Sequence, residues 1–282
     1  MKVLKIINNN FIVARDRETE VVAMGRGLGF DVEVGQDIDL SKVQKIFRLG
    51  EKKYLKQYSE IIENTPEEHI QIANEVIYYI KSKVKKKLNG NIYITLTDHI
   101  SFAIERFRKG ISLQNPLRYD VKVIYQQEYE VGKYAIKIIR KRTGLSFPDD
   151  EAASIALHIV NSEYETEIDQ LVHLTEYMGD TIRYVESFFD LHIEETSLDF
   201  NRFITHLRFF LLRLLKKEHI EVGKELKDII SNNYAKEYEC AANIVERVCA
   251  IYGCENQQDE AIYLALHIRR LLEHQREGTN EK

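Results

Sequence analysis

A long stretch of this 282-residue sequence occurs twice, and the repetition limits the possible folds more than any other feature. Residues 129–159 align with residues 238–268 at a constant offset of 109, and ten of the 31 aligned pairs are identical. Most identities lie in the pattern Asp-Glu-Ala-x-x-x-Ala-Leu-His-Ile. A shorter stretch upstream aligns at an offset of 107 and retains His99/His206, Phe102/Phe209 and Arg106/Arg213. A period of this length is too long for a solenoid unit, so the sequence predicts two copies of one domain.

The repeated part of the chain has the pattern of helices. Apolar residues recur at helical spacing, as in Ile70, Ala73, Val76, Ile77 and Ile80,. Pro66 followed by two glutamates is typical of a helix start, and the basic run 83–87 is favourable at the negative end of a helix dipole,. We therefore predict two all-α helical-bundle domains, over residues 64–169 and 170–282, with their junction near residues 163–171.

The first 50 residues have a different pattern. Short β-branched or alternating runs predict strands over 3–7, 11–14, 20–24 and 43–49, and residues 25–30 form a glycine-rich loop between the last two,. A module of this size buries little apolar surface by itself. We therefore predict a small all-β module over residues 1–56 that forms a dimer.

Charge and composition separate this module from the rest of the chain. Residues 1–56 hold 11 Lys and Arg against 8 Asp and Glu, a net charge of +3, while the remainder has 29 against 37, a net charge of −8. The difference favours a nucleic-acid site in the N-terminal module. No apolar run is long enough to cross a membrane, so no membrane insertion is expected. The three cysteines match no zinc pattern, and we expect reduced thiols in a cytoplasmic protein,.

Four of the nine histidines, namely His99, His158, His206 and His267, occupy matched positions in the two copies. A single histidine on an apolar helix face is usually a core residue held by hydrogen bonds. However, most of the aligned stretch has diverged while both histidines persist in both copies. This retention favours a functional role for the four side chains.

Three kinds of chemistry could use these histidines. A metal site could add Asp98, Asp150 and Glu151 as ligands, but the histidines of one copy lie about 60 residues apart, without a His-x-x-x-His spacing,. Triad catalysis lacks a Gly-x-Ser-x-Gly motif, and the cysteines occur in one copy only. A neutral imidazole is a good nucleophile toward phosphorus, and phosphorylation adds a charge that can switch an interface. Asp98 could orient His99, whereas Asp150 and Glu151 are expected to cap a helix. Residue types alone do not choose between phosphate and metal.

The glycine-rich loop can be interpreted in two ways. Gly25, Arg26 and Gly27 match neither a P-loop nor a dinucleotide-binding motif,. One interpretation is a tight turn. The other is RNA contact, in which glycines allow close approach of the backbone, Arg26 binds phosphate and Phe30 stacks on a base. The run 8–10 supplies asparagine amides that could contact bases, or it could be a plain turn.

Taken together, these motifs resemble the transcriptional antiterminators of the bacterial sugar phosphotransferase system over essentially the whole chain. The motifs that carry the resemblance are Ile6-Ile7-Asn8-Asn9-Asn10, Met24-Gly25-Arg26-Gly27-Leu28-Gly29-Phe30, Leu96-Thr97-Asp98-His99-Ile100, Ala156-Leu157-His158-Ile159-Val160-Asn161, Thr205-His206-Leu207 and Leu266-His267-Ile268. The resemblance implies a dimeric co-antiterminator domain that grips a hairpin in a nascent leader RNA. A terminator stem then cannot form, and transcription continues through a sugar-utilisation operon.

The resemblance also implies roles for individual residues. The RNA-facing residues would be Lys5, Asn8, Asn10, Gly25, Arg26, Gly27 and Phe30. The two repeats resemble phosphotransferase regulation domains, whose histidines would be phosphorylated by the phosphocarrier protein HPr or by a sugar permease (enzyme II). Phosphate on His99 and His158 would inactivate the protein, and phosphate on His206 and His267 would activate it by favouring a closed homodimer. No cofactor and no bound metal are implied.

Two other classes of protein remain as alternatives. One is an enzyme, a metal- or histidine-dependent phosphotransferase, which would need a pocket with convergent polar groups. The other is a DNA-binding regulator with the same regulatory domains, which would need a helix-turn-helix where residues 1–50 indicate strands.

Overall fold

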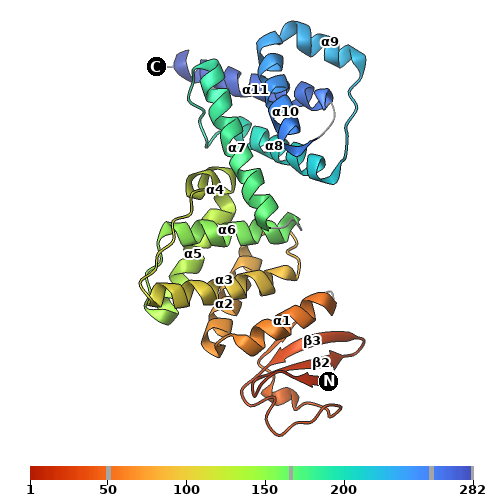
Figure 1. Cartoon of the computed structure of the whole chain (residues 1–282), viewed down its shortest axis with the longest axis vertical. Helices are drawn as coiled ribbons and strands as arrows, with labels where there is room; N and C mark the ends of the chain where they lie inside the picture. The colour runs from red at the N-terminus through yellow and green to blue at the C-terminus, as the bar shows by residue number, and fades with distance from the viewer. Residues whose placement is uncertain (49–51, 165–167, 254–256, 281–282) are drawn as a thin grey trace. The chain divides into compact units, whose positions relative to one another are not determined.

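The computed structural model describes residues 1–48, 52–164, 168–253 and 257–280 (Figure 1). The chain divides into two compact units, Met1–Leu171 and Val172–Lys282, and each is described by itself. The first unit begins with β-strands and continues as helices. The second unit consists of helices within the part of the chain that the structure describes. A small β module followed by a mostly helical region is the arrangement predicted from the sequence.

The N-terminal module is one antiparallel sheet in which neighbouring strands follow each other along the chain. Its strands are β1 (Lys2–Ile6), β2 (Phe11–Asp16), β3 (Thr19–Met24) and β4 (Lys45–Phe47). The segment between β3 and β4 contains one 3-10 turn at Leu40–Lys42. These strands confirm the predicted ones to within two residues, except that Leu49, the predicted end of the last strand, lies outside the described residues.

Both faces of this sheet are buried. One face carries Val3, Ile12 and Val21 and is covered by the module's own loop residues Leu28 and Ile38. The other face carries the side chains of β2, β3 and β4 that join the main core of the first unit, Phe11, Val13, Val22 and Phe47. Alternation along each strand separates the two sets, as the period of two requires.

The second face of the sheet packs against the first helices of the chain. The helix α1 (Lys52–Asn64) lies beside β3 (Figure 1) and contributes Leu55, Tyr58 and Ile62 to the shared core. The rings of Phe47 and Tyr58 make an edge contact with 5.7 Å between their centroids. The dimer was expected because the module lacks enough core of its own. In the structure α1 and the helix after it supply that cover, so this reason for a dimer no longer applies, and the dimer stays a prediction.

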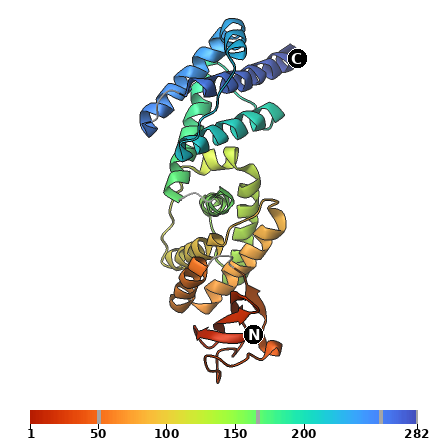
Figure 2. The same ribbon diagram turned by 90° about the vertical axis from the view of Figure 1, so that its right-hand side faces the viewer.

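The remaining helices of the first unit form a bundle. They are α2 (Glu67–Lys83), α3 (Asn91–Arg108), α4 (Arg118–Ile124), α5 (Gln126–Thr143) and α6 (Asp149–Tyr164). The predicted helix start is confirmed, since α2 begins directly after Pro66. The basic run 83–87 reaches past the end of α2, so only its first residue belongs to the helix. Helix α6 packs against α3, α4 and α5, and Figure 2 shows it end-on among them.

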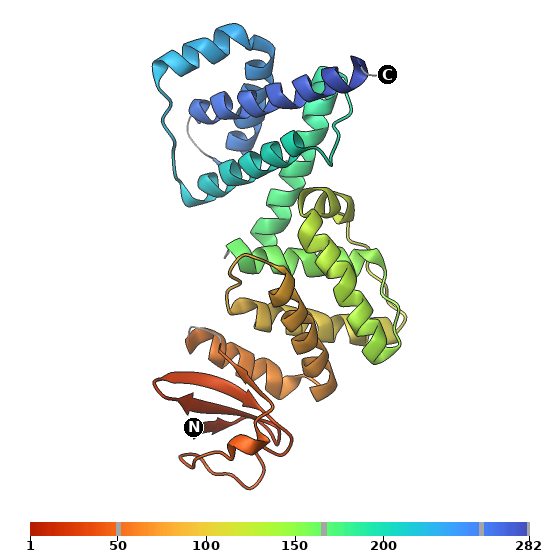
Figure 3. The same ribbon diagram turned by 180° about the vertical axis from the view of Figure 1, so that it is seen from behind.

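The second unit repeats this order of helices. After α7 (Ile168–Phe189) come α8 (Leu198–Lys216), α9 (Lys224–Asn233), α10 (Ala235–Tyr252) and α11 (Gln258–Asn280). Helix α11 packs against α8, α9 and α10, as α6 packs against α3, α4 and α5 (Figure 3). Helix α7 runs through the predicted boundary at residue 170. The boundaries 1–56, 64–169 and 170–282 stay predictions.

One identity of the repeat has a direct backbone reason. Gly144 ends α5 and Gly253 ends α10, both in the left-handed conformation with φ of 74° and 63°. A side chain is strained at such an angle, so glycine is favoured at this helix end.

Cys240 is buried and Cys249 is half-buried, and both are free thiols, while Cys254 lies outside the described residues. Burial raises the pKa of the Cys240 thiol to about 12, which disfavours the thiolate,.

Within the described residues, no helix is both long and apolar enough to span a bilayer.

Candidate functional sites

The structure brings together the two histidines of the first repeat. His99 lies on α3 and His158 lies on α6, and their ring centroids are 4.7 Å apart. The 58 residues between them include α4 and α5, which return the chain so that α6 packs against α3. The two imidazoles therefore form one site rather than two.

A buried carboxylate joins this histidine pair to an arginine. Glu151 in the first turn of α6 contacts His99 Nε2 through Oε2 at 3.2 Å, and its Oε1 accepts a hydrogen bond from Arg106. The side chains of Glu151 and Arg106 are each only 7% exposed, so both charges are largely removed from water. Such a pair is stable only when each charge has its partner. The first repeat thus holds a compact cluster of two histidines, one glutamate and one arginine.

The second repeat holds the same cluster. His206 on α8 and His267 on α11 have ring centroids 4.7 Å apart, and Glu260 is 1% exposed beside them. Arg213 donates to both oxygens of Glu260, from Nε and Nη2, at 2.7 Å each. His206 Nε2 is 3.9 Å from Glu260 Oε2, longer than the corresponding contact of His99. In the first repeat Glu151 therefore contacts both His99 and Arg106. In the second repeat both oxygens of Glu260 bond to Arg213, and His206 lies farther away.

Burial keeps several of these imidazoles neutral. For His158, burial and then the nearby His99 hold the pKa well below its ordinary value of 6.5. For His206, burial followed by His267 and Arg213 lowers the pKa to about 4. For His267, burial and then two nearby arginines lower the pKa as well. A neutral imidazole keeps the lone pair that an attack on phosphorus requires.

Sequence reasoning assigned no role to the arginine and misassigned the glutamate. Asp150 and Glu151 do lie in the first turn of α6, but Asp150 Oδ1 accepts from the backbone nitrogen of Asn115 at 2.9 Å, and Glu151 bonds across to α3. Neither contact is the expected helix cap. The sequence does contain a signal for both residues. Helices α3 and α8 each contain His-x6-Arg, and helices α6 and α11 each contain Glu-x6-His. A spacing of seven places both members on one helix face.

The predicted RNA-contact residues gather on one edge of the β module. Two loops are joined there, because Gly25 and Gly29 donate backbone hydrogen bonds to the carbonyls of Asn10 and Asn9, both at 2.9 Å. Gly27 N also donates to Asn10 Oδ1 at 2.8 Å. Arg26 is exposed and Phe30 is 60% exposed on the resulting surface. An exposed cation and an exposed ring beside glycine backbone suit contact with RNA.

Several of these residues also have structural reasons to be what they are. A Cβ on Gly25 would lie 1.9 Å from the carbonyl oxygen of Lys42, so this glycine makes room for the chain itself. Asn8 Oδ1 accepts from the backbone nitrogens of Asn10 and Phe11, as in an Asx turn,. Gly27 has a φ of 67° and open space beside it. The exposed Arg26 and Phe30 are therefore the residues whose placement favours RNA contact most clearly.

The other two predicted RNA-contact residues are engaged by acidic side chains. Lys5 Nζ lies 2.6 Å from Glu63 Oε1, and Asn10 Nδ2 donates to Glu67 Oε2 at 2.6 Å. Both glutamates belong to the helices that pack on the sheet, at the end of α1 and the start of α2.

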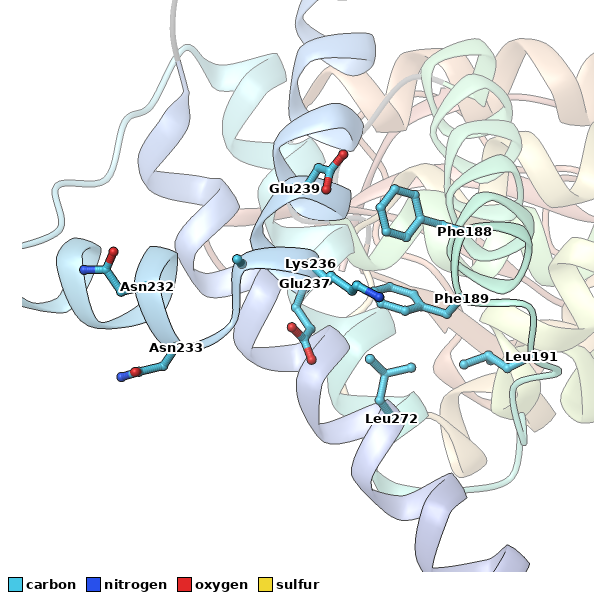
Figure 4. Close-up of a pocket in the computed structure, with 10 residues that line it drawn as sticks. Phe188, Phe189, Leu191, Asn232, Asn233, Lys236, Glu237, Glu239 and Leu272 are labelled. Atoms are coloured by element: carbon cyan, nitrogen blue, oxygen red, sulfur yellow. The ribbon is translucent and has the colours of Figure 1, made fainter.

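A pocket in the second unit bears on the enzyme alternative. It has a volume of about 830 Å³, and Figure 4 shows aromatic rings from α7 on one side of it and polar side chains around the start of α10 on the other. Its lining is Phe188, Phe189, Leu191, Asn232, Asn233, Ala235, Lys236, Glu237, Glu239 and Leu272. None of the four matched histidines belongs to that lining. Among the described residues, no three histidine, cysteine or acidic side chains are grouped so that they could hold a metal ion.

An all-β module with an exposed arginine-glycine loop, followed by helices that twice carry the same paired histidines, defines an RNA-binding regulator with two control domains. Comparisons with known families agree with this class. Residues 1–56 match the CAT RNA binding domain, and residues 74–162 and 179–271 each match the PRD domain. The chain belongs to the family of transcription antiterminators built from these domains.

Individual relatives are similar over their full lengths. The chain is 38% identical to "Transcription antiterminator LicT" of Bacillus subtilis (strain 168), over 96% of this chain and 99% of that protein. It is 35% identical to "Beta-glucoside operon antiterminator" of Dickeya chrysanthemi, over the whole of both chains. A solved structure titled "Crystal structure of GlcT CAT-PRDI" is 34% identical, with a TM-score of 0.50, and covers 57% of this chain and 97% of that chain.

Proposed function

We propose that this protein binds a hairpin in a leader RNA and thereby prevents termination of a sugar-utilisation operon. The N-terminal module supplies the RNA surface, through the exposed Arg26 and Phe30 together with Lys5, Asn8, Asn10, Gly25 and Gly27. Arg26 contacts phosphate or a base edge, and Phe30 offers a face for stacking. The protein acts as a cytoplasmic homodimer and as a regulator rather than an enzyme.

Control of this activity comes from two copies of one helical domain, over residues 64–169 and 170–282. HPr or the sugar permease phosphorylates His99 and His158 in the first copy, which inactivates the protein. Phosphate on His206 and His267 in the second copy activates it. In each transfer the lone pair of a neutral imidazole nitrogen attacks phosphorus, and the bond from phosphorus to the donor atom breaks with its electron pair returning to the donor. The acceptor ring then loses the proton of its other nitrogen, and the released donor group takes up a proton.

The observation that carries this proposal is the double occurrence of the same four-residue cluster. An arginine stands beside each histidine pair, and guanidinium groups bind phosphate well. Arg106 is buried, and its Nε has no hydrogen-bond partner among the described residues, which leaves a donor available for a phosphoryl oxygen. A purely structural core histidine would not need an arginine and a glutamate at the same positions in both copies.

The test is phosphoryl transfer to the full chain. Phosphorylated HPr, and separately the phosphorylated permease domain, would be mixed with wild-type protein and with alanine variants of the four histidines. Intact mass at non-acidic pH counts the phosphates. His173→Ala is the control, because His173 is an exposed histidine outside both clusters. We expect wild type and control to gain the same number of phosphates and particular cluster variants to gain fewer. Transfer from neither donor, or transfer that survives all four variants, would refute histidine control.

RNA binding is tested separately from phosphorylation. Arg26→Ala should weaken binding of a stem-loop RNA by roughly 1–3 kcal/mol if the guanidinium makes a paired contact. Affinity should also fall as salt rises, because phosphate contacts release counterions. Duplex DNA of the same length is the competitor that addresses the DNA-binding alternative. Unchanged affinity of Arg26→Ala, or preference for the duplex DNA, would show that the RNA surface is assigned incorrectly.

A further inference from the structure

The RNA surface of the β module is partly occupied by the first helices of the regulatory part. The ammonium group of Lys5 contacts Glu63, and the amide nitrogen of Asn10 donates to Glu67, at 2.6 Å in both cases. The amide oxygen of Asn10 accepts from Gly27 N at 2.8 Å. Both ends of the Asn10 amide are therefore in use, and the Lys5 charge has a counterion.

These contacts follow from how the helices are held against the sheet. Glu63 is near the end of α1 and Glu67 is the first residue of α2, so both lie at the turn that joins the two helices. The same helices share a continuous apolar core with Phe11, Val13 and Phe47 of the sheet. The core thus brings the turn close to the RNA surface.

The second glutamate is also held by its own helix. Gln71 Nε2 donates to Glu67 Oε1 at 3.0 Å, while Glu67 Oε2 accepts from Asn10. The carboxylate is therefore bound on both oxygens, one to α2 and one to the β module. This arrangement links the position of α2 directly to the state of an RNA-contact residue.

A carboxylate and an RNA phosphate accept hydrogen bonds from the same donors. We propose that Glu63 and Glu67 compete with RNA for Lys5 and Asn10, so that tight RNA binding requires the turn between α1 and α2 to withdraw. This inference rests on the RNA surface proposed above. An RNA backbone placed at Lys5 and Asn10 would also be repelled by the two carboxylates, so RNA and the closed turn exclude each other.

Both contacts are partly exposed, with Lys5 53% and Glu63 37% accessible, so each acts as a brake of modest strength. Exposed ion pairs have small free energies, which correspond to roughly a two- to fivefold change in affinity for each contact. The two contacts together then change RNA affinity by about tenfold. A contact of this strength is readily reversed, which suits an inhibitory contact that must open when RNA binds.

The experiment uses the full, unphosphorylated chain and a fluorescein-labelled stem-loop RNA, selected beforehand by wild-type protein from a pool of hairpins. Anisotropy titrations give the Kd for wild type, Glu63→Gln, Glu67→Gln and the double variant. The matched control is Glu60→Gln, an exposed residue of α1 that removes the same charge from the same helix. We expect both single variants to bind more tightly than the control, and the double variant to combine the two gains.

A Lys5→Gln background makes the test specific to the contact. If Glu63 acts through Lys5, Glu63→Gln should gain nothing once Lys5 is replaced. Equal gains for Glu63→Gln and Glu60→Gln would overturn the proposal, because net charge alone would then explain the effect. No gain in either single variant would overturn it as well. Failure of the proposed RNA function is a distinct result, since wild-type protein would then select no hairpin from the pool.

Discussion

His206 in the second repeat should make the stability of that unit depend on pH. The side chain of His206 is 17% exposed, and burial followed by His267 and Arg213 lowers its pKa from 6.5 to about 4. In the unfolded chain the imidazole regains its ordinary value and binds a proton first as the pH falls. The unfolded state then holds more protons than the folded state, so stability decreases as the pH drops from about 6.5 toward 4. Above 6.5 the contribution is fully present.

The size of the effect follows from the two pKa values. Protonation of His206 in the unfolded chain alone lowers the free energy of unfolding by about 2 kcal/mol between pH 7 and pH 5. Replacement by glutamine removes the titrating group while keeping a polar side chain of similar length. Wild type should therefore lose about 2 kcal/mol more than His206→Gln over this range.

Urea unfolding followed by circular dichroism at the two pH values measures this difference. The relevant transition is the one whose midpoint changes on substitution, since the chain has two units,. His173→Gln, on the surface of α7, is the control and should follow the wild-type pH dependence. If His206→Gln shows the same loss between pH 7 and pH 5 as wild type, the imidazole is not desolvated as described, and the argument for a neutral nucleophile at this position is wrong.

Other substitutions test the packing of the helical units, with the free energy of unfolding as the measurement. Glu260→Ala leaves Arg213 beside a buried site without its counterion and should cost about 3 kcal/mol, while pairing Glu260→Leu with Arg213→Met should recover most of it; a double variant as unstable as the single one would contradict this. Gly144→Ala should cost about 1 kcal/mol because φ is 74° with open space around it,. Gly132→Ala should cost more, up to about 3 kcal/mol, because its Cβ would lie 2.3 Å from the carbonyl oxygen of Ala152,; equal costs would show that the helices can move apart.

Much of the fold follows from local sequence patterns. The strand alternation and the helix start after Pro66 depend on neighbouring residues, and the structure confirms both. Alternation along β2 also predicts a two-faced strand. It does not reveal what covers each face, because the residues that pack against Phe11 and Val13 come from helices more than 40 positions later. Small size alone therefore does not reveal whether a second molecule or the same chain covers this face, and the dimer stays a prediction.

The candidate site was predictable in its members but not in its geometry. The repeat identified all four histidines, but only tertiary packing of α3 on α6 places His99 and His158 in ring contact. Glu151 shows most clearly how tertiary packing can override a local preference. A glutamate in a first helical turn is favoured as a partner of the helix dipole, yet burial next to Arg106 requires that its charge be paired there,. The desolvated pair therefore determined the contact.

The sheet face that packs on α1 and α2 has a consequence for how protein concentration affects this molecule. Phe11, Val13, Val22 and Phe47 are apolar and cannot stay exposed to water without cost,. Cover by the helices of the same chain involves no loss of translational freedom, whereas cover by a second molecule does. Low protein concentration therefore favours the single chain whose own helices cover its sheet. High protein concentration favours any arrangement in which the sheet of one copy is covered by a second copy. A variant that weakens the contact between α1 and the sheet should for that reason show a state of association that depends more steeply on concentration than that of wild type.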